Sequence, residues 1–176
     1  MNLRRPALLV LALTTVALAG CTPDPQPSPT PTPAFASEEE AFAAAEETFD
    51  RYNDALNNID LQDPESFDAL FELSSGSVEK SDRENFSSMH AEGWTISGDS
   101  RVTRFKGVRS DPPHVEVVAA VCLDVSDVVI TDVSGNSTVD PERPDVYPLM
   151  VTMKISGGGK LLVDSAARME EHQCSA

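Results

Sequence analysis

Few residues in this chain combine a reactive side chain with a spacing that chemistry requires. Tyr52 lies in an apolar stripe, where its hydroxyl either reaches into a pocket or, more commonly, sits at the rim of the core. The single tryptophan, Trp94, is the second candidate pocket residue. The three histidines, His90, His114 and His172, lie far apart, and no pair has the spacing of a metal-binding helix motif. We therefore predict surface or hydrogen-bonded roles for the histidines.

One acidic segment is similar to the start of a calcium-binding loop. Residues 132–136 read Asp-Val-Ser-Gly-Asn, with oxygen-bearing side chains at alternate positions. A calcium loop also needs glycine at its sixth position and a bidentate glutamate at its twelfth, where this chain has Ser137 and Arg143. The sequence also contains no Gly-x-Ser-x-Gly nucleophile motif and no phosphate-binding P-loop. We therefore predict no catalytic residues, no metal site and no cofactor.

The balance of charges excludes several kinds of partner. The chain has 176 residues, with 13 Lys and Arg against 29 Asp and Glu, and a formal net charge of −16. Nucleic-acid binding requires clustered basic side chains that displace counterions from phosphates, so we expect no nucleic acid as a partner. The same charge disfavours direct docking on anionic lipid headgroups. The hydrophobic fraction of 40% is enough for one ordinary domain with a core.

The N-terminus has the features of an export signal. Arg4 and Arg5 precede an apolar run over 7–19, and a run of about 13 residues suits a signal peptide but is too short to span a membrane. The run ends in Leu-Ala-Gly-Cys21, which resembles the lipobox of bacterial lipoproteins of the actinobacterial type. The resemblance implies cleavage before Cys21, lipidation of its thiol, and attachment to the extracytoplasmic face of the cell membrane. An ordinary secretory signal with an unrelated cysteine is the alternative.

A proline-rich segment follows the lipobox. Proline occupies every second position over 23–33, and proline lacks an N–H group and restricts the residue before it. We predict an extended polyproline-II stalk of roughly 35–40 Å that holds a domain away from the membrane. A proline-rich ligand for a partner domain is the alternative. The chain then divides into signal peptide 1–20, lipidated cysteine and stalk 21–36, and domain 37–176, and we expect the domain to fold without residues 22–36.

Two cysteines remain once Cys21 is lipidated. Export places the domain in a compartment that permits oxidation, and two thiols in such a domain favour a disulfide between Cys122 and Cys174. Free buried cysteines are the alternative. The bond would join a long predicted strand to the C-terminal tail, which has few apolar residues to hold it in place.

The first half of the domain has the periodicity of helices. Ser37 and the three glutamates after it begin a predicted helix of about 20 residues with one apolar face. This face consists of Phe42, Ala45, Phe49, Tyr52, Leu56 and Ile59. Asp63 and Pro64 begin a second, short helix. A third helix is predicted over 78–91 and ends at Gly93.

Beyond the third helix the apolar residues alternate with a period of two, which indicates strands. The pattern is strong over 115–125, 149–155 and 161–169, and weaker over 94–105 and 128–133. Helices followed by antiparallel strands predict an α+β fold, with N-terminal helices packed on a curved antiparallel sheet of four to five strands.

This order of elements resembles the NTF2-like, or cystatin-like cone, superfamily. The likeness is carried by the helix over 41–56, which is rich in Ala, Phe and Tyr, by the segment His-Ala-Glu-Gly-Trp94, and by the strands after it. It implies a bent sheet that wraps around the first helix and leaves a pocket, for which Tyr52 and Trp94 are the candidate lining residues. Dimerisation through the sheet is common in such families, so a homodimer is one expectation.

Two functions are compatible with these features. The first is a non-catalytic, lipid-anchored extracytoplasmic module that binds a ligand or a protein partner of unknown identity. The alternative is a small enzyme of the same fold, of isomerase, dehydratase or hydrolase type, with its site inside the cone. We favour the first because the superfamily's catalytic motifs do not match this chain residue by residue, whereas the export and anchoring signals are specific.

The lipobox yields the first testable prediction. Replacing Cys21→Ala removes the thiol that accepts the lipid, so the variant should lose signal cleavage at this site and should carry no lipid that attaches it to the membrane. Cell fractionation and the mass of the processed chain measure both effects. A variant that is cleaved and membrane-bound like the wild type would show that Cys21 is not the anchor.

Overall fold

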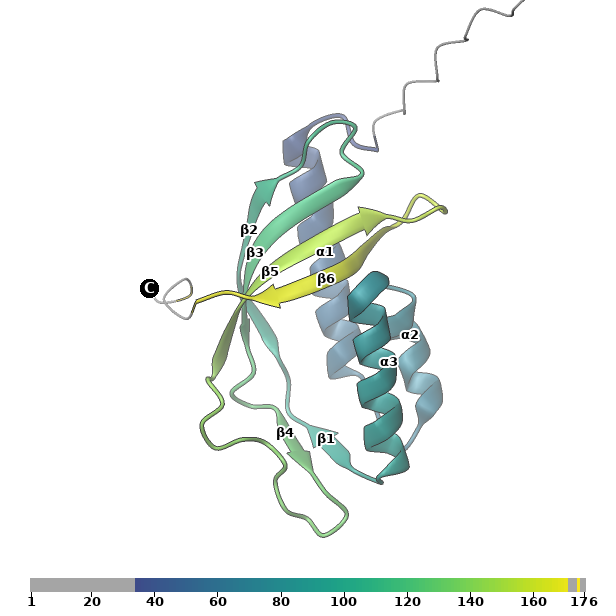
Figure 1. The fold of residues 1–176 in the computed structure, drawn as a ribbon, viewed down its shortest axis with the longest axis vertical. Helices are drawn as coiled ribbons and strands as arrows, with labels where there is room; N and C mark the ends of the chain where they lie inside the picture. Colours follow the sequence, from purple (N-terminus) through teal and green to yellow (C-terminus); the bar gives the residue numbers. More distant parts are fainter. Residues whose placement is uncertain (1–33, 171–173, 175–176) are drawn as a thin grey trace, which may run out of the picture. The chain divides into compact units, whose positions relative to one another are not determined.

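The computed structural model describes residues 34–170 and 174, and its helices precede its strands (Figure 1). The helical segments are α1 (Glu38–Asn57), the 3-10 helix η1 (Pro64–Phe67), α2 (Asp68–Phe71) and α3 (Gly76–Ala91). The strands are β1 (Thr95–Ser97), β2 (Arg101–Arg109), β3 (Glu116–Asp124), β4 (Val129–Thr131), β5 (Val146–Ile155) and β6 (Leu161–Arg168). The predicted signal peptide, Cys21 and the stalk as far as residue 33 lie outside the described residues.

The first two helical segments begin where the sequence predicts, because a side chain caps each. Ser37 Oγ accepts a hydrogen bond from the Glu40 backbone N–H at 3.2 Å, and the Glu40 carboxylate accepts one from the Ala36 N–H at 2.8 Å. Asp63 accepts a hydrogen bond from the Glu65 N–H at 3.1 Å at the start of η1. These bonds satisfy N–H groups that a helix leaves free in its first turn.

The main sheet has the strand order β2-β3-β5-β6, and every neighbouring pair is antiparallel. Val117 of β3 pairs with Met153 of β5, and Val121 pairs with Leu149. Alternate residues of β3 and β5 are completely buried and form the inner face of the sheet. Strands β1 and β4 form a separate two-stranded sheet. The predicted α+β fold, with helices on an antiparallel sheet, is therefore confirmed.

Helix α1 packs against the inner face of the main sheet (Figure 1). The ring of Phe49 lies 6.5 Å, centroid to centroid, from that of Phe105 on β2. Phe42 occupies the space beside Gly107, where a Cβ atom would come within 2.3 Å of the Phe42 ring. Strand β2 also shifts register twice against β3, and such bulges bend a strand. The bulges fit the curved sheet that the sequence predicts.

The strand predicted over 94–105 is interrupted at Gly98. Its backbone has φ +76°, and a Cβ atom at this position would lie 1.9 Å from the Asp127 carbonyl oxygen. Glycine is the residue that tolerates both the positive φ and the close approach. The chain therefore turns after Ser97, so that β1 leaves the main sheet and pairs with β4.

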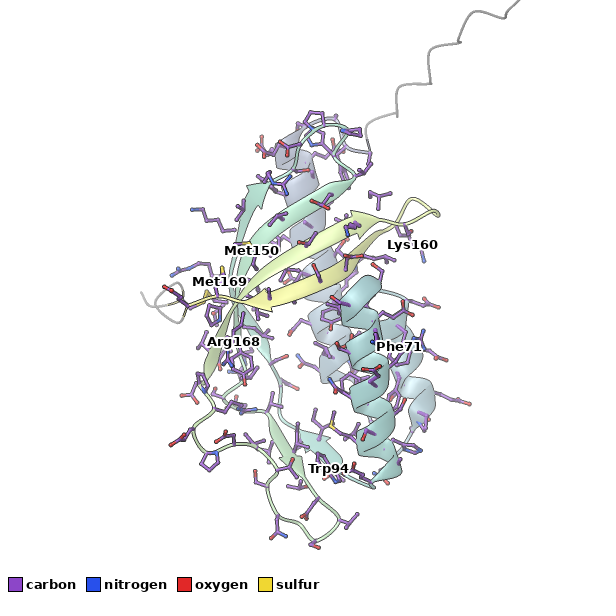
Figure 2. All side chains as sticks on the ribbon, in the orientation of Figure 1. Phe71, Trp94, Met150, Lys160, Arg168 and Met169 are labelled. Atoms are coloured by element: carbon purple, nitrogen blue, oxygen red, sulfur yellow. A yellow bond between two sulfur atoms is a disulfide. The ribbon has the colours of Figure 1, made fainter. Side chains whose placement is uncertain are left out.

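The C-terminal tail is tied to the face of the sheet opposite α1. The predicted disulfide between Cys122 and Cys174 is present, with an S–S distance of 2.02 Å. The Met169 N–H donates a hydrogen bond to the Pro148 carbonyl at 2.8 Å, and Pro148 pairs with Cys122 across β5 and β3. Figure 2 shows Met169 just beyond the end of β6. The tail thus leaves an edge strand and is bonded covalently to an inner strand.

Residues that the sequence assigns to the end of the stalk contact the domain. The Ala34 N–H donates a hydrogen bond to the Pro113 carbonyl at 2.9 Å. Phe35 is half-buried and packs against the hydrophobic core, and Ala36 donates to the cap of α1 as described above. Residues 34–36 therefore belong to the folded unit, which shortens the expected stalk at its C-terminal end.

One buried polar contact joins α1 to α3. The Tyr52 hydroxyl donates a hydrogen bond to the Asp82 carboxylate at 2.9 Å. Burial raises the pKa of Asp82 to about 6; the bond from Tyr52 opposes that rise, and the charge of Glu79 adds to it. Burial, followed by the negative charge of Asp82, raises the pKa of Tyr52. Asp82 lies one helical turn before Phe86, so the contact also fixes the position of that ring.

The contacts of residues 34–36 predict a cost of truncation. A domain beginning at Ser37 lacks the Ala34 hydrogen bond and the Phe35 ring, and should lose about 1–2 kcal/mol relative to one beginning at Ala34. Urea denaturation of the two domains measures the difference, and Phe35→Ala in the longer domain separates the ring from the backbone contacts. Equal urea denaturation midpoints for the two domains would show that residues 34–36 do not stabilise the fold and belong to the stalk.

The raised pKa of Asp82 predicts a pH dependence of stability. An unfolded aspartate ionises near pH 4, whereas folded Asp82 ionises near pH 6. The folded state therefore binds more protons between these values, so this group's contribution to the free energy of unfolding falls as pH rises from about 4 to about 6. Asp82→Asn keeps an oxygen acceptor for Tyr52 but cannot ionise. The stability of the variant relative to wild type should rise by about 1–2 kcal/mol over this window, after allowance for solvent screening.

Urea denaturation of both proteins at several pH values between 4 and 7 measures this difference. Glu84→Gln on the exposed side of the same helix is the matched control, since it removes one charge without touching Tyr52. If the free energies of unfolding of the wild type and Asp82→Asn change equally between pH 4 and 6, the raised pKa of Asp82 is contradicted.

Candidate functional site

An apolar cavity lies where the C-terminal end of α1 meets α3, β1 and the loop after β3. Its volume is about 220 Å³. Apolar side chains from these segments form most of its wall: Leu56, Phe86, Ile96, Leu123, Val125 and Val128. The polar part of the wall comes from the end of α1 and from the turn between β1 and β2. This combination of a largely apolar wall and a polar side is typical of small-molecule sites.

The polar side of the cavity is held by a closed set of hydrogen bonds. Asn53 and Asn57, one turn apart on α1, both donate side-chain N–H groups to the Ser100 carbonyl, at 3.1 and 2.9 Å. The Ser100 N–H donates to Asn57 Oδ1 at 2.9 Å, and its hydroxyl lies 2.7 Å from Asn53 Oδ1. Asn53 and Ser100 are buried. A satisfied network of this kind fixes the turn between β1 and β2 against α1.

This network is the part of the site that the sequence interpretation missed. Two asparagines at i and i+4 beside the apolar stripe of α1 are a local signal for a polar contact on that side of the helix. The partner, Ser100, is 47 residues after Asn53 in the chain, and local patterning does not identify it.

A serine–histidine pair lies at the opposite end of α1. Ser110 Oγ is 3.1 Å from His114 Nδ1 and also donates to the Glu116 carbonyl at 3.1 Å. Because the hydroxyl proton is used by Glu116, the His114 ring N–H donates to Ser110 Oγ. Ser110 is 2% exposed, and its backbone N–H donates to the Glu38 carboxylate at 3.1 Å. The pair therefore fastens the β2–β3 loop to the start of α1, with no serine hydroxyl presented to a substrate.

The two residues predicted from sequence to line a pocket lie elsewhere. Tyr52 is buried between α1 and α3, with its hydroxyl on Asp82. Trp94 follows α3 and is half-buried against the core, near the C-terminal end of that helix (Figure 2). Neither residue is in the wall of the apolar cavity. Both stabilise the elements that form that wall.

The remaining candidate ligands have structural roles. His90 Nδ1 lies 2.7 Å from the Leu61 carbonyl, and His172 lies outside the described residues. The Asp132 carboxylate accepts hydrogen bonds from the Ser134 and Asn136 N–H groups at 2.8 and 2.9 Å, as in an ordinary turn. Over 34–170 and 174, no group of three or more His, Cys, Asp or Glu side chains is arranged to hold a metal ion. In the same part of the chain, no helix has the length and apolar character to cross a membrane.

Comparison with known proteins gives a fold but no family. No protein-family model and no curated protein matches the sequence. The intermembrane space region of the chloroplast protein ARC6 has a similar structure, with a TM-score of 0.53 and 12% identity, over 74% of this chain and 97% of that one. A protein from Catenulispora acidiphila has a TM-score of 0.49 and 14% identity, over 79% of this chain and 97% of that one. The first likeness supports the α+β fold, and at such identities the fold alone is shared.

Proposed function

We propose that this protein is a lipid-anchored, extracytoplasmic binding module, and that its ligand site is the apolar cavity at the C-terminal end of α1. The observation that carries the proposal is the cavity itself, with its wall of apolar side chains fixed by the core and by a closed polar network. A preformed apolar wall lowers the cost of binding, because few side chains must become ordered.

The composition of the wall supports binding better than catalysis. Of the described residues that line the cavity, Asp99 alone is titratable. Acid–base or nucleophilic catalysis needs at least two groups that converge on the reacting atoms. In the two polar pairs found elsewhere, Tyr52 with Asp82 and Ser110 with His114, the side chains bond to each other, and none of the four lines the cavity.

The anchoring part of the proposal rests on sequence. The apolar run, the Leu-Ala-Gly-Cys21 motif and the prolines after it favour export, lipidation and a stalk. The lipid and the stalk would hold the cavity in the extracytoplasmic space within reach of ligands there. The disulfide supports the same location, since such bonds persist in oxidising compartments.

Filling the cavity tests the proposal. The neutral probe 2-phenylethanol should bind the domain saturably, with a Kd of roughly 1–10 mM for a ligand of this size. Val128→Phe adds a ring to the wall and should abolish binding. Val129→Phe is the matched control, because the adjacent Val129 is 41% exposed and lies outside this wall. Amide chemical shifts of Ile96 and Leu123 report occupancy.

Two results would contradict the proposal. The first is an absence of saturable shifts in the wild-type domain. The second is equal binding by the Val128→Phe variant, which would place the probe somewhere other than the cavity.

A further inference from the structure

An acidic groove adjoins the apolar cavity and shares part of its wall. The groove has a volume of about 410 Å³. Asn57, Asp99 and Ser100 line both the groove and the cavity. Beyond this shared wall, the groove is lined by Asp50 and Asp54, which lie one turn apart on α1. A molecule seated in the cavity therefore has a polar, negatively charged surface directly beside it.

The carboxylates of this groove are not neutralised within the domain. Over 34–170 and 174, the side chains of Asp50, Asp54 and Asp99 make no hydrogen bond or ion pair, although the Asp54 backbone carbonyl does accept hydrogen bonds. The one cation lining the groove among these residues, Arg101, is paired with Asp127. Burial and the neighbouring charge of Asp54 raise the pKa of Asp50. An incoming cation would relieve this repulsion.

The polar groups between the two spaces belong to the network that holds the turn between β1 and β2. Asn57 and Ser100 already bond to each other and to Asn53, as described for the polar network. A ligand that competed for these groups would have to break bonds that hold the turn between β1 and β2 in place. Asp99 is exposed, lines both spaces and takes no part in this hydrogen-bond network. Among the described residues that line the cavity, its carboxylate is thus the charged group open to a ligand, beside the neutral hydroxyl of Ser97.

We propose that the cavity takes a small molecule with an apolar body and an ammonium group, the body buried in the cavity and the ammonium placed among the carboxylates of Asp50, Asp54 and Asp99. This inference rests on the proposed function and names the class of its ligand. A neutral apolar molecule leaves the carboxylates unpaired. An anionic one is repelled by them and by the net charge of −16.

The expected selectivity is modest, because all three carboxylates belong to exposed residues. Attraction between exposed charges is weak in water and is screened by salt. A cation should therefore bind about 3–10-fold more tightly than a neutral molecule of the same shape, and the preference should shrink in about 0.5 M NaCl.

Three probes of matched shape test the inference: phenethylamine, 2-phenylethanol and 3-phenylpropionate, which are cationic, neutral and anionic at pH 7. Their Kd values are measured on the domain by chemical-shift titration. Phenethylamine should bind most tightly and 3-phenylpropionate least. The Asp54→Asn/Asp99→Asn variant should lose the preference for the amine over 2-phenylethanol, and a cooperative urea denaturation curve shows that it is folded. Glu84→Gln, a charge loss at an exposed residue of α3 that lines neither space, should change none of the three.

The outcomes separate this inference from the proposed function. Equal binding of the amine and the alcohol, or a preference for the amine that survives in the Asp54→Asn/Asp99→Asn variant, overturns the inference and leaves the cavity as an apolar site. If none of the three probes binds, the proposed function fails with it. Amine binding without any binding of the alcohol would place the amine on surface charge alone and would also overturn the inference.

Discussion

The burial of one face of α1 against the inner side of the main sheet is the contact on which the rest of the structure depends. Residues of this face, among them Ala45 and Phe49, are almost completely buried, and Val117 and Val121 of β3 belong to the same cluster. Burial of a large apolar side chain contributes about 1.5–3 kcal/mol, so the cluster dominates the stability of the domain. The cavity lies at the end of this cluster, where α1 stops and the sheet continues.

The hydrogen-bonded polar residues of this domain mainly fix the positions of turns, loops and helices that apolar packing alone does not determine. Asn53 and Asn57 hold the turn at Ser100, Ser110 and His114 hold the β2–β3 loop, and Tyr52 holds α3 through Asp82. Over the described residues, no buried side-chain nitrogen or oxygen lacks a hydrogen-bond partner, which is the condition under which buried polar groups specify a single arrangement.

The sequence predicts those features that depend on neighbouring residues. The Ser37 cap and the alternation in β3 are local patterns, and both elements are found within about one residue of the expected bounds. The disulfide was predictable because the predicted lipidation of Cys21 would leave two thiols in an exported domain. The break at Gly98 was not predicted, since the close approach of the distant Asp127 carbonyl cannot be identified from local sequence.

The cavity is less predictable for the same reason. Its wall combines residues from segments as far apart as Leu56 and Val128, and no local pattern states which of them meet. Tyr52 had the right type and position on α1, but its hydroxyl donates a hydrogen bond to Asp82, 30 residues away.

Within the described residues, the Cys122–Cys174 bond makes the response of the domain to a pulling force asymmetric. A pull transmitted along the chain from the N-terminal side reaches α1 first. The cross-link excludes the 52 residues between the cysteines from extension, which is roughly 170–190 Å of chain. A domain tethered in this way would extend its helices, β2 and most of β3 under tension, while β4, β5 and β6 stayed within the cross-linked segment.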